Sequence, residues 1–248
     1  MRRPAALIAA GAAAFLFFFV ALLPASVLLR FIPQDVGLAG VTGTVWRGRA
    51  DAMIVRGKDI GPLRWSNRPW RLALLEIDYA VELRPGDGTV EMDVRIAPGG
   101  RLELADVTGR FPLAAIDGLL APRGWRGTAD LAVERLSLQA GFPREALGSV
   151  VVRDLTAPGV RPLNIGSFEL TLGEGAVGTE AISGRLSDLG TGPMRVRATL
   201  ELKPDRSYLI KGEVAAGPEA SGAVQRNLAF LGPPDSQGRR PFAIEGTL

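Results

Sequence analysis

The chain has 248 residues, with 29 lysines and arginines against 26 acidic residues, and it contains neither cysteine nor histidine. The absence of these two residue types excludes disulfides, thiol nucleophiles, most zinc sites and every catalytic arrangement that needs a histidine base. The basic excess equals the three arginines Arg2, Arg3 and Arg30, so residues 31–248 carry no net charge and nucleic acid is not expected as a partner.

The N-terminal segment is strongly apolar. Residues 4–29 carry no charge, and residues 5–23 (AALIAAGAAAFLFFFVALL) match the roughly 20 apolar residues that a helix needs to cross a bilayer. The two arginines before this segment favour a cytoplasmic N-terminus. A cleaved signal peptide is the alternative, but its apolar core is usually about 7–15 residues and PASVLL at 24–29 is a poor cleavage site. We therefore predict a cytoplasmic stub and single transmembrane anchor at 1–30, followed by a periplasmic β-rich domain at 31–248.

The first part of the predicted domain alternates apolar and polar residues with period two, which is typical of strands with one buried face. This alternation covers residues 75–83 and 90–96, and a third strand begins at Leu102. Turn sequences rich in proline and glycine separate the strands at 85–88 and 98–100. Consecutive strands joined by tight turns predict an antiparallel meander.

The same alternation resumes in the second half of the chain. Further strands are predicted at 168–172, 194–202, 208–214 and 242–248, with weaker ones at 42–46, 52–55, 128–138, 149–155 and 182–186. Two short stretches, 113–120 and 220–231, are predicted to be helical. The chain after the anchor is therefore predicted to be mainly β.

Two architectures can bury one apolar face of every strand: a two-sheet sandwich, or one long curled sheet whose apolar concave face lines a groove. A glycine-bearing segment, GVTGT at 40–44, has echoes at 107–110, 182–186 and 244–248. A glycine inside a strand permits a bulge or a bend, so its recurrence would suit a sheet that bends repeatedly. Chance is an equally good explanation in a chain with 31 glycines, and both architectures stay open.

One segment has the spacing of a dinucleotide-binding loop. Residues 173–178 read GEGAVG, but the residues after them predict a strand and not the helix whose N-terminus would hold a pyrophosphate. No acidic residue lies at or beside position 198, where ribose recognition would need one. A glycine-rich hairpin is the better interpretation. The other carboxylates alternate with apolar residues, as solvated positions do, so we expect no enzyme, no cofactor and no metal site.

The four tryptophans each neighbour an arginine, and these pairs form a candidate interface. Such pairs suit cation–π stacking, contacts with a protein partner, or a belt at the level of lipid head groups. Tryptophans of the core, each with an arginine covering its edge, are the alternative. The candidate interface residues are Trp46, Arg47, Trp65, Trp70, Trp125 and Arg126.

Several short segments, taken in order, give the chain a family resemblance. Residues 40–48 read GVTGTVWRG, LRW and PWR follow at 63–65 and 69–71, and residues 228–240 read LAFLGPPDSQGRR before a final strand. Together with the apolar N-terminal segment, this order resembles the type II secretion system protein N family over essentially the whole chain. The resemblance implies a single-pass inner-membrane protein with a periplasmic domain, an accessory part of the machine that moves folded proteins across the outer membrane of Gram-negative bacteria.

The resemblance implies no catalytic residue, and the partners it implies are other inner-membrane and periplasmic components of the same apparatus. The expected function is therefore non-catalytic assembly through the periplasmic domain. A lipid-binding or lipid-transfer protein is the alternative. A curled sheet with an apolar lining would hold acyl chains, and the glycine-bearing strands resemble those of AsmA-like groove proteins.

Overall fold

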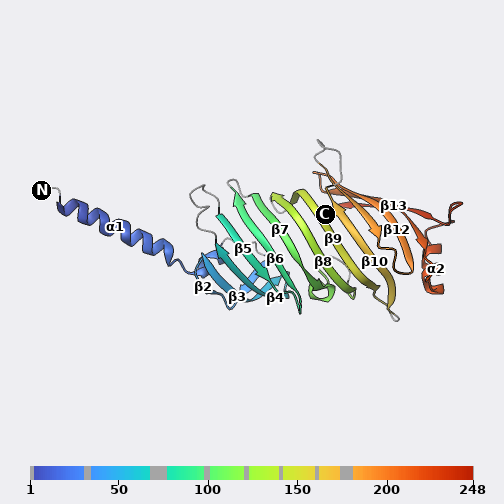
Figure 1. The fold of residues 1–248 in the computed structure, drawn as a ribbon, viewed down its shortest axis with the longest axis horizontal. Helices are drawn as coiled ribbons and strands as arrows, with labels where there is room; N and C mark the ends of the chain where they lie inside the picture. Colours follow the sequence, from blue (N-terminus) through green and yellow to red (C-terminus); the bar gives the residue numbers. More distant parts are fainter. Residues whose placement is uncertain are drawn as a thin grey trace.

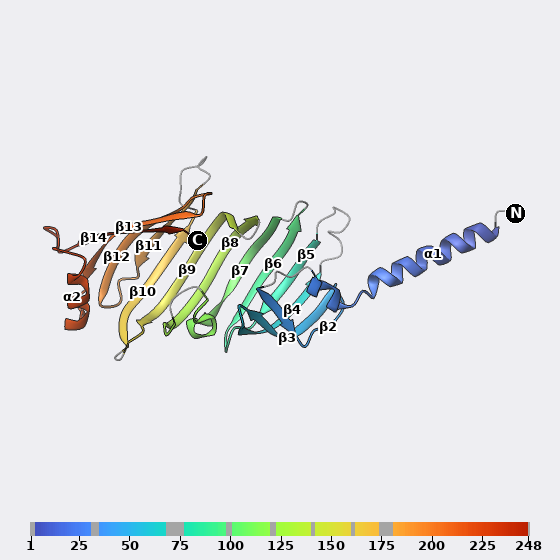
Figure 2. The same ribbon diagram turned by 180° about the vertical axis from the view of Figure 1, so that it is seen from behind.

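The described chain forms one long, open antiparallel sheet with a helix near each end (Figure 1). The computed structural model describes residues 3–30, 35–67, 77–97, 101–119, 123–139, 142–159, 162–173 and 181–247. Helix α1 (Arg3–Ala21) and the 3₁₀ helix η1 (Ala25–Arg30) precede the sheet. Helix α2 (Gly222–Ala229) lies at the far end, and the view from behind shows the same arrangement (Figure 2).

Fourteen strands make up the described part of the sheet. They are β1 (Val36–Ala39), β2 (Thr42–Gly43), β3 (Arg47–Val55), β4 (Lys58–Asn67), β5 (Ile77–Leu83), β6 (Thr89–Ala97), β7 (Arg101–Pro112), β8 (Arg126–Gln139), β9 (Phe142–Ala157), β10 (Leu163–Leu172), β11 (Ile182–Asp188), β12 (Met194–Leu202), β13 (Ser207–Ala216) and β14 (Arg240–Thr247). From β3 onward each strand pairs with the next one along the chain, while β1 and β2 both pair with β3.

The predicted antiparallel meander is confirmed as a single long sheet. The two-sheet sandwich is wrong, because all the described strands belong to this one sheet. From β3 onward each connection joins strands that pair with each other, and all the described strands belong to the same sheet.

The period-two pattern misses the short strand β1 and, next to β3 near the start of the sheet, strand β4. Gly61 and Pro62 interrupt its alternation, and Gly61 takes a φ of +130° that lets the backbone pass close to the Arg84 carbonyl. Of the helix predicted at 113–120, the described residues 113–119 contain only the 3₁₀ helix η3 (Leu113–Ile116), whereas the helix predicted at 220–231 is confirmed as α2. The segment 174–180 lies outside the described residues, and the two strands that flank it, β10 and β11, pair antiparallel.

The strand register places apolar residues in a row across one face of the sheet. Directly paired residues point to the same face. From β4 to β12 this apolar row consists of Leu63, Leu83, Val90, Gly109, Leu131, Val150, Leu170, Leu186 and Ala198. The residues that alternate with it point to the opposite, polar face.

Three clusters of buried side chains lie along the apolar face. The proximal cluster, nearest α1, contains Ala25, Ala50, Trp65 and Tyr79; the central cluster contains Val90, Val107, Phe111, Ala129 and Val133; the distal cluster contains Phe168, Val196, Val214, Val224 and Leu228. Each cluster is covered by a short helical element, which is η1, η3 or α2 in turn. The helices therefore shield only parts of the apolar face.

Helix α1 falls on the apolar segment where the sequence predicts a transmembrane anchor. Within the described residues, however, no helix has the combination of length and hydropathy that a membrane span requires. The predicted anchor is therefore not confirmed by the fold.

Candidate functional site at the junction of helix and sheet

Helix α1 is joined to the first strands of the sheet by backbone and side-chain hydrogen bonds. The Trp46 indole Nε1–H donates to the Val20 carbonyl oxygen at 2.8 Å, and the Val45 N–H donates to the Leu23 carbonyl oxygen at 2.9 Å. Pro24 forms an isolated β-bridge with Thr44. We call these two segments, residues 20–25 and 44–46, the clasp.

The clasp adds a second hydrogen bond to a backbone carbonyl in the last turn of α1. The Val20 carbonyl belongs to the last turn of α1, where the usual donor would be the N–H of residue 24. Residue 24 is proline and has no N–H to give. The Leu23 N–H donates to the Val20 carbonyl at 3.3 Å, and the Trp46 indole adds a shorter second hydrogen bond from the first edge of the sheet, across 26 residues of sequence.

Trp65, a buried residue of the proximal cluster, donates hydrogen bonds to the clasp segment 44–46. Its side chain is only 6% exposed, and its Nε1–H lies 3.1 Å from the Val45 carbonyl and 3.3 Å from the Thr44 carbonyl. Its ring covers Gly48, the residue directly opposite it on β3. A Cβ at Gly48 would come within 2.5 Å of the ring, so this position accepts only glycine without a shift of the indole.

The candidate interface residues divide into two groups. Trp46, Arg47 and Trp65 come together at the clasp, where Trp65 is buried, Trp46 is half-buried and Arg47 is exposed. Trp125 and Arg126 lie apart from them, at the start of β8, four strands along the sheet from β4. Trp70 lies outside the described residues. Whether any of these residues contacts a partner stays a prediction.

The tryptophan–arginine pairs do not stack on each other in the described part of the chain. The cation–π contacts found there place Arg144 and Arg206 over the ring of Phe142. The Trp125 Nε1 is buried and has no hydrogen-bond partner among the described residues, in contrast to the indoles of Trp46 and Trp65. Of the three described tryptophans, Trp46 and Trp65 therefore stabilise the clasp through hydrogen bonds of their indoles.

Beside the clasp, strands β2 to β7 line an open cavity of about 970 Å³ on the polar face of the sheet. Its charged lining consists of Arg47, Arg49, Arg64, Glu82, Glu91, Asp93 and Asp106. Four of these residues form what we call the charged row, because each lies directly opposite the next on neighbouring strands: Arg49, Arg64, Glu82 and Glu91. The row thus has two positive charges followed by two negative ones.

Sequence reasoning did not single out Arg49, Glu82 or Glu91 for this cavity. Period-two alternation indicates that each points away from the apolar face, but it does not reveal which strands lie side by side. Arg64 was noted only as the neighbour of Trp65. The pairing of β3 with β4 and of β4 with β5 brings these residues together.

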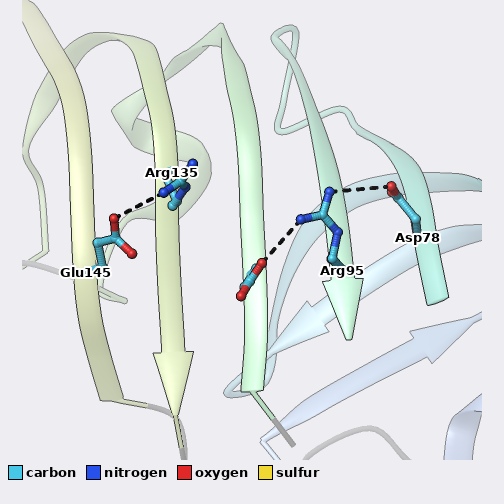
Figure 3. Close-up of polar contacts among 5 residues, drawn as sticks. Asp78, Arg95, Arg135 and Glu145 are labelled. Carbon is cyan, nitrogen blue, oxygen red and sulfur yellow. Dashed lines mark hydrogen bonds and ion pairs between the residues drawn. The ribbon is translucent and has the colours of Figure 1, made fainter. Parts of the chain in front are cut away.

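Farther along the same face, charges of opposite sign are paired. Arg95 lies 3.8 Å from Asp78 and 3.3 Å from Glu103, and Arg135 lies 3.4 Å from Glu145 (Figure 3). Opposite charges across neighbouring strands stabilise a sheet modestly, and like charges destabilise it. The charged row differs from this pattern at its two ends, where Arg49 faces Arg64 and Glu82 faces Glu91, while Arg64 and Glu82 in its middle have opposite charges.

Asp130 provides a further example of pairing on this face. Its carboxylate accepts a hydrogen bond from Arg110 and lies 2.8 Å from the Arg153 Nε. The hydrogen bond from Arg110, helped by Arg153, lowers the pKa of the Asp130 carboxyl from its ordinary value. No group of three or more metal-ligating side chains occurs among the described residues.

Comparison with known proteins decides the family. The family model described as "Type II secretion system (T2SS), protein N" matches residues 34–243. The chain belongs to the type II secretion system protein N family.

Relatives named type II secretion system protein N align over nearly their whole length. The protein from Aeromonas hydrophila is 28% identical over 95% of both chains, and that from Vibrio cholerae is 25% identical over 91% of both. The protein from Klebsiella pneumoniae is 26% identical over 95% of this chain and 92% of its own. No solved structure matches this chain. The part matched by the protein N model begins before β1 and ends within β14, so it contains both the charged row and the sheet half of the clasp.

Proposed function

We propose that this chain is a non-catalytic assembly component of the type II secretion apparatus, held at the inner membrane by α1 with its sheet in the periplasm. The observation that carries the proposal is the clasp, in which Trp46 and Val45 bind the last turn of α1 and the residues after it. Such a junction fixes the direction in which the sheet leaves the helix. A sheet fixed in this way would hold its far end at a set distance from the membrane.

The exposed side chains of α1 support a place in lipid. Phe15, Phe17, Phe18 and Phe19 are each 59–69% exposed. A contiguous apolar surface of this kind is unfavourable in water and favourable in the hydrocarbon of a bilayer. Arg2 and Arg3 precede the segment and favour a cytoplasmic N-terminus, which sends the sheet to the periplasmic side.

The far edge of the sheet supplies a contact for partners. Strand β14 pairs only with β13 among the described strands, so the hydrogen-bonding groups of its outer side are open. Ile244 in β14 is 50% exposed, and Phe230, in the turn after α2, is 88% exposed. Arg240 ties that turn to the start of β14 through a 2.9 Å hydrogen bond to the Gly232 carbonyl. A strand added to β14 would gain backbone hydrogen bonds and apolar contacts together.

One experiment tests the anchoring by α1, and a second tests the partner contact at β14. Alkaline extraction of membranes should leave the full chain in the membrane pellet, and protease added to the periplasmic side should remove a C-terminal tag. Release of the chain by alkali, or a tag reachable only from the cytoplasm, contradicts the anchoring.

The second experiment places a photo-crosslinking benzoylphenylalanine at Ile244 in cells that assemble the apparatus. We expect crosslinks to an identified secretion component. The matched control carries the same residue at Glu201, an exposed position inside the sheet on β12. No crosslink at position 244, or equal crosslinking at both positions, contradicts the edge contact.

One observation favours a second candidate function, the binding of lipid acyl chains on the apolar face. Leu83, Leu131, Val150, Leu170 and Leu186 of the apolar row are all only half-buried. No second sheet covers them within the described residues. An apolar face left partly open in this way offers a surface for acyl chains.

Native mass spectrometry of the detergent-extracted full chain tests this second function. A stoichiometric phospholipid that is lost in Leu131→Asn supports it. The control, Ala132→Asn, changes the adjacent exposed residue on the opposite face and should keep the lipid. A lipid-free mass of the unmodified chain contradicts it.

A further inference from the structure

We propose that Arg49 and Arg64, with Arg47 beside them, bind the phosphate of an anionic phospholipid head group. The inference rests on the proposed anchoring of α1 in the membrane. The site lies on the polar face of the sheet, so it is separate from the apolar row.

Arg49 and Arg64 face each other, and neither side chain has a partner among the described residues. Arg49 and Arg64 lie directly opposite on β3 and β4, and both are exposed. Neither side chain forms an ion pair or a hydrogen bond with another residue in the described part of the chain. Cross-strand neighbours lie about 5 Å apart, where like charges repel. An anion between them turns this repulsion into attraction, and guanidinium groups bind phosphate through paired N–H donors.

The site lies where a helix that leaves the membrane would meet the head groups. Arg47 follows Trp46 directly, and the Trp46 indole contacts the last turn of α1. Arg49 is two residues farther along β3, on the same face as Arg47. The hydrogen bond from Trp46 to Val20 therefore brings the start of this arginine group beside the end of the apolar helix in space, at the depth where charged side chains meet lipid phosphates.

The cavity has the room and the polarity for a head group. Its volume of about 970 Å³ lies within the usual range for sites that hold small ligands. The acidic residues Glu82, Glu91, Asp93 and Asp106 line its other end and repel an anion. Glu82 lies 2.6 Å from Arg84, which is outside the cavity lining. The phosphate is therefore placed at the β3–β4 end, between the arginines.

Calorimetric titration of the detergent-solubilised full chain tests the proposal. The probe is short-chain phosphatidylglycerol, and short-chain phosphatidylcholine and inorganic phosphate are titrated separately. We expect binding of phosphatidylglycerol that weakens roughly tenfold or more in the double variant Arg49→Gln/Arg64→Gln, the loss that two charge-assisted contacts imply. The control double variant, Arg197→Gln/Arg226→Gln, removes two exposed arginines near the distal cluster and should bind like the unmodified chain.

The outcomes separate the possible sources of the signal. Equal affinity for inorganic phosphate would show a site for free phosphate and overturn the head-group assignment. Equal losses in both double variants would show a general effect of charge and also overturn it, as would unchanged binding in Arg49→Gln/Arg64→Gln. Circular dichroism confirms that each variant keeps its sheet. Because the titration uses detergent and no bilayer, its result does not depend on the alkaline extraction, and either proposal can fail alone.

Discussion

The Trp46 indole donates its hydrogen bond to the Val20 carbonyl, whose usual helical donor is replaced by Pro24. Pro24, which follows the end of α1 at Ala21, and Trp46 are thus two parts of one junction. Without the Trp46 indole, the Val20 carbonyl would keep only the 3.3 Å hydrogen bond from the Leu23 N–H, and α1 would lose one of its contacts with the sheet. The clasp ties α1 to the first strands of a sheet that has fourteen strands among the described residues.

Trp46→Phe keeps the aromatic ring and removes only the hydrogen bond to Val20. We expect a loss of about 0.5–1.5 kcal/mol in the free energy of unfolding, the usual net value of one hydrogen bond. Hydrogen exchange should quicken at the Val45 amide, which donates to Leu23 in the same junction. Trp125→Phe is the matched control, because its indole N–H has no partner among the described residues. Equal destabilisation by both variants would contradict the role given to the clasp.

Gly109→Ala tests whether β7 needs glycine where its backbone takes a positive φ close to the neighbouring strand. Gly109 has a φ of +150°, and a Cβ there would lie 2.7 Å from the Val90 Cα. We expect a loss of about 1–3 kcal/mol in stability, measured by urea unfolding, because the residue would be strained and crowded at once. Gly37→Ala is the control: its added Cβ would meet only the Ile54 Cβ at 3.8 Å. That variant should be neutral or slightly more stable.

Leu228→Ala tests how strongly α2 holds the distal cluster. Leu228 is 4% exposed and packs with Val224 against strands of the apolar face. Removing its buried atoms should cost about 2–5 kcal/mol and lower the thermal midpoint. Leu231→Ala, at a position that is 45% exposed just beyond the helix, should change stability by less than about 1 kcal/mol. A loss in Leu228→Ala no larger than that in Leu231→Ala would show that packing of α2 on the distal cluster contributes little to stability.

Asp130→Asn tests the pairing of this carboxylate with Arg110 and Arg153. Arg110 and Arg153 lower the pKa of Asp130 in the folded protein. The ionised form therefore stabilises the fold at pH values above the pKa of an unfolded aspartate, and this contribution disappears as the pH falls through the lower folded pKa. The variant should be less stable at pH 7 by about 0.5–1 kcal/mol, the scale of exposed ion pairs.

Urea unfolding of both proteins between pH 7 and pH 3 measures the difference. It should shrink steadily below about pH 4, near the ordinary pKa of aspartate, and it should also shrink in 1 M salt. A difference that stays constant across this range would show that Asp130 acts through packing and not through charge.

Two features of the site were within reach of the sequence for local reasons. The sequence indicated a position near the membrane for Trp46, the first tryptophan after the apolar segment, and the hydrogen bond to Val20 places it beside α1. The candidate residue Trp65 also belongs to the junction. Its indole is buried, however, where it packs in the proximal cluster and donates a hydrogen bond to the clasp. By contrast, nothing local distinguishes Trp125, which lies four strands away, from the tryptophans of the clasp.

The sequence by itself determined the apolar N-terminal segment, the neutral charge of the rest and most of the strands, because period-two alternation and turn residues act over a few neighbours. Only the tertiary structure decided that the strands form one sheet, that Arg49 faces Arg64, and that Trp46 reaches Val20. These contacts depend on register, and register shifts such as the one between Glu91 and Asp93 change which side chains meet. Contacts between residues far apart in sequence depend on which strands pair and in which register, and a pattern of a few neighbouring residues does not carry that information.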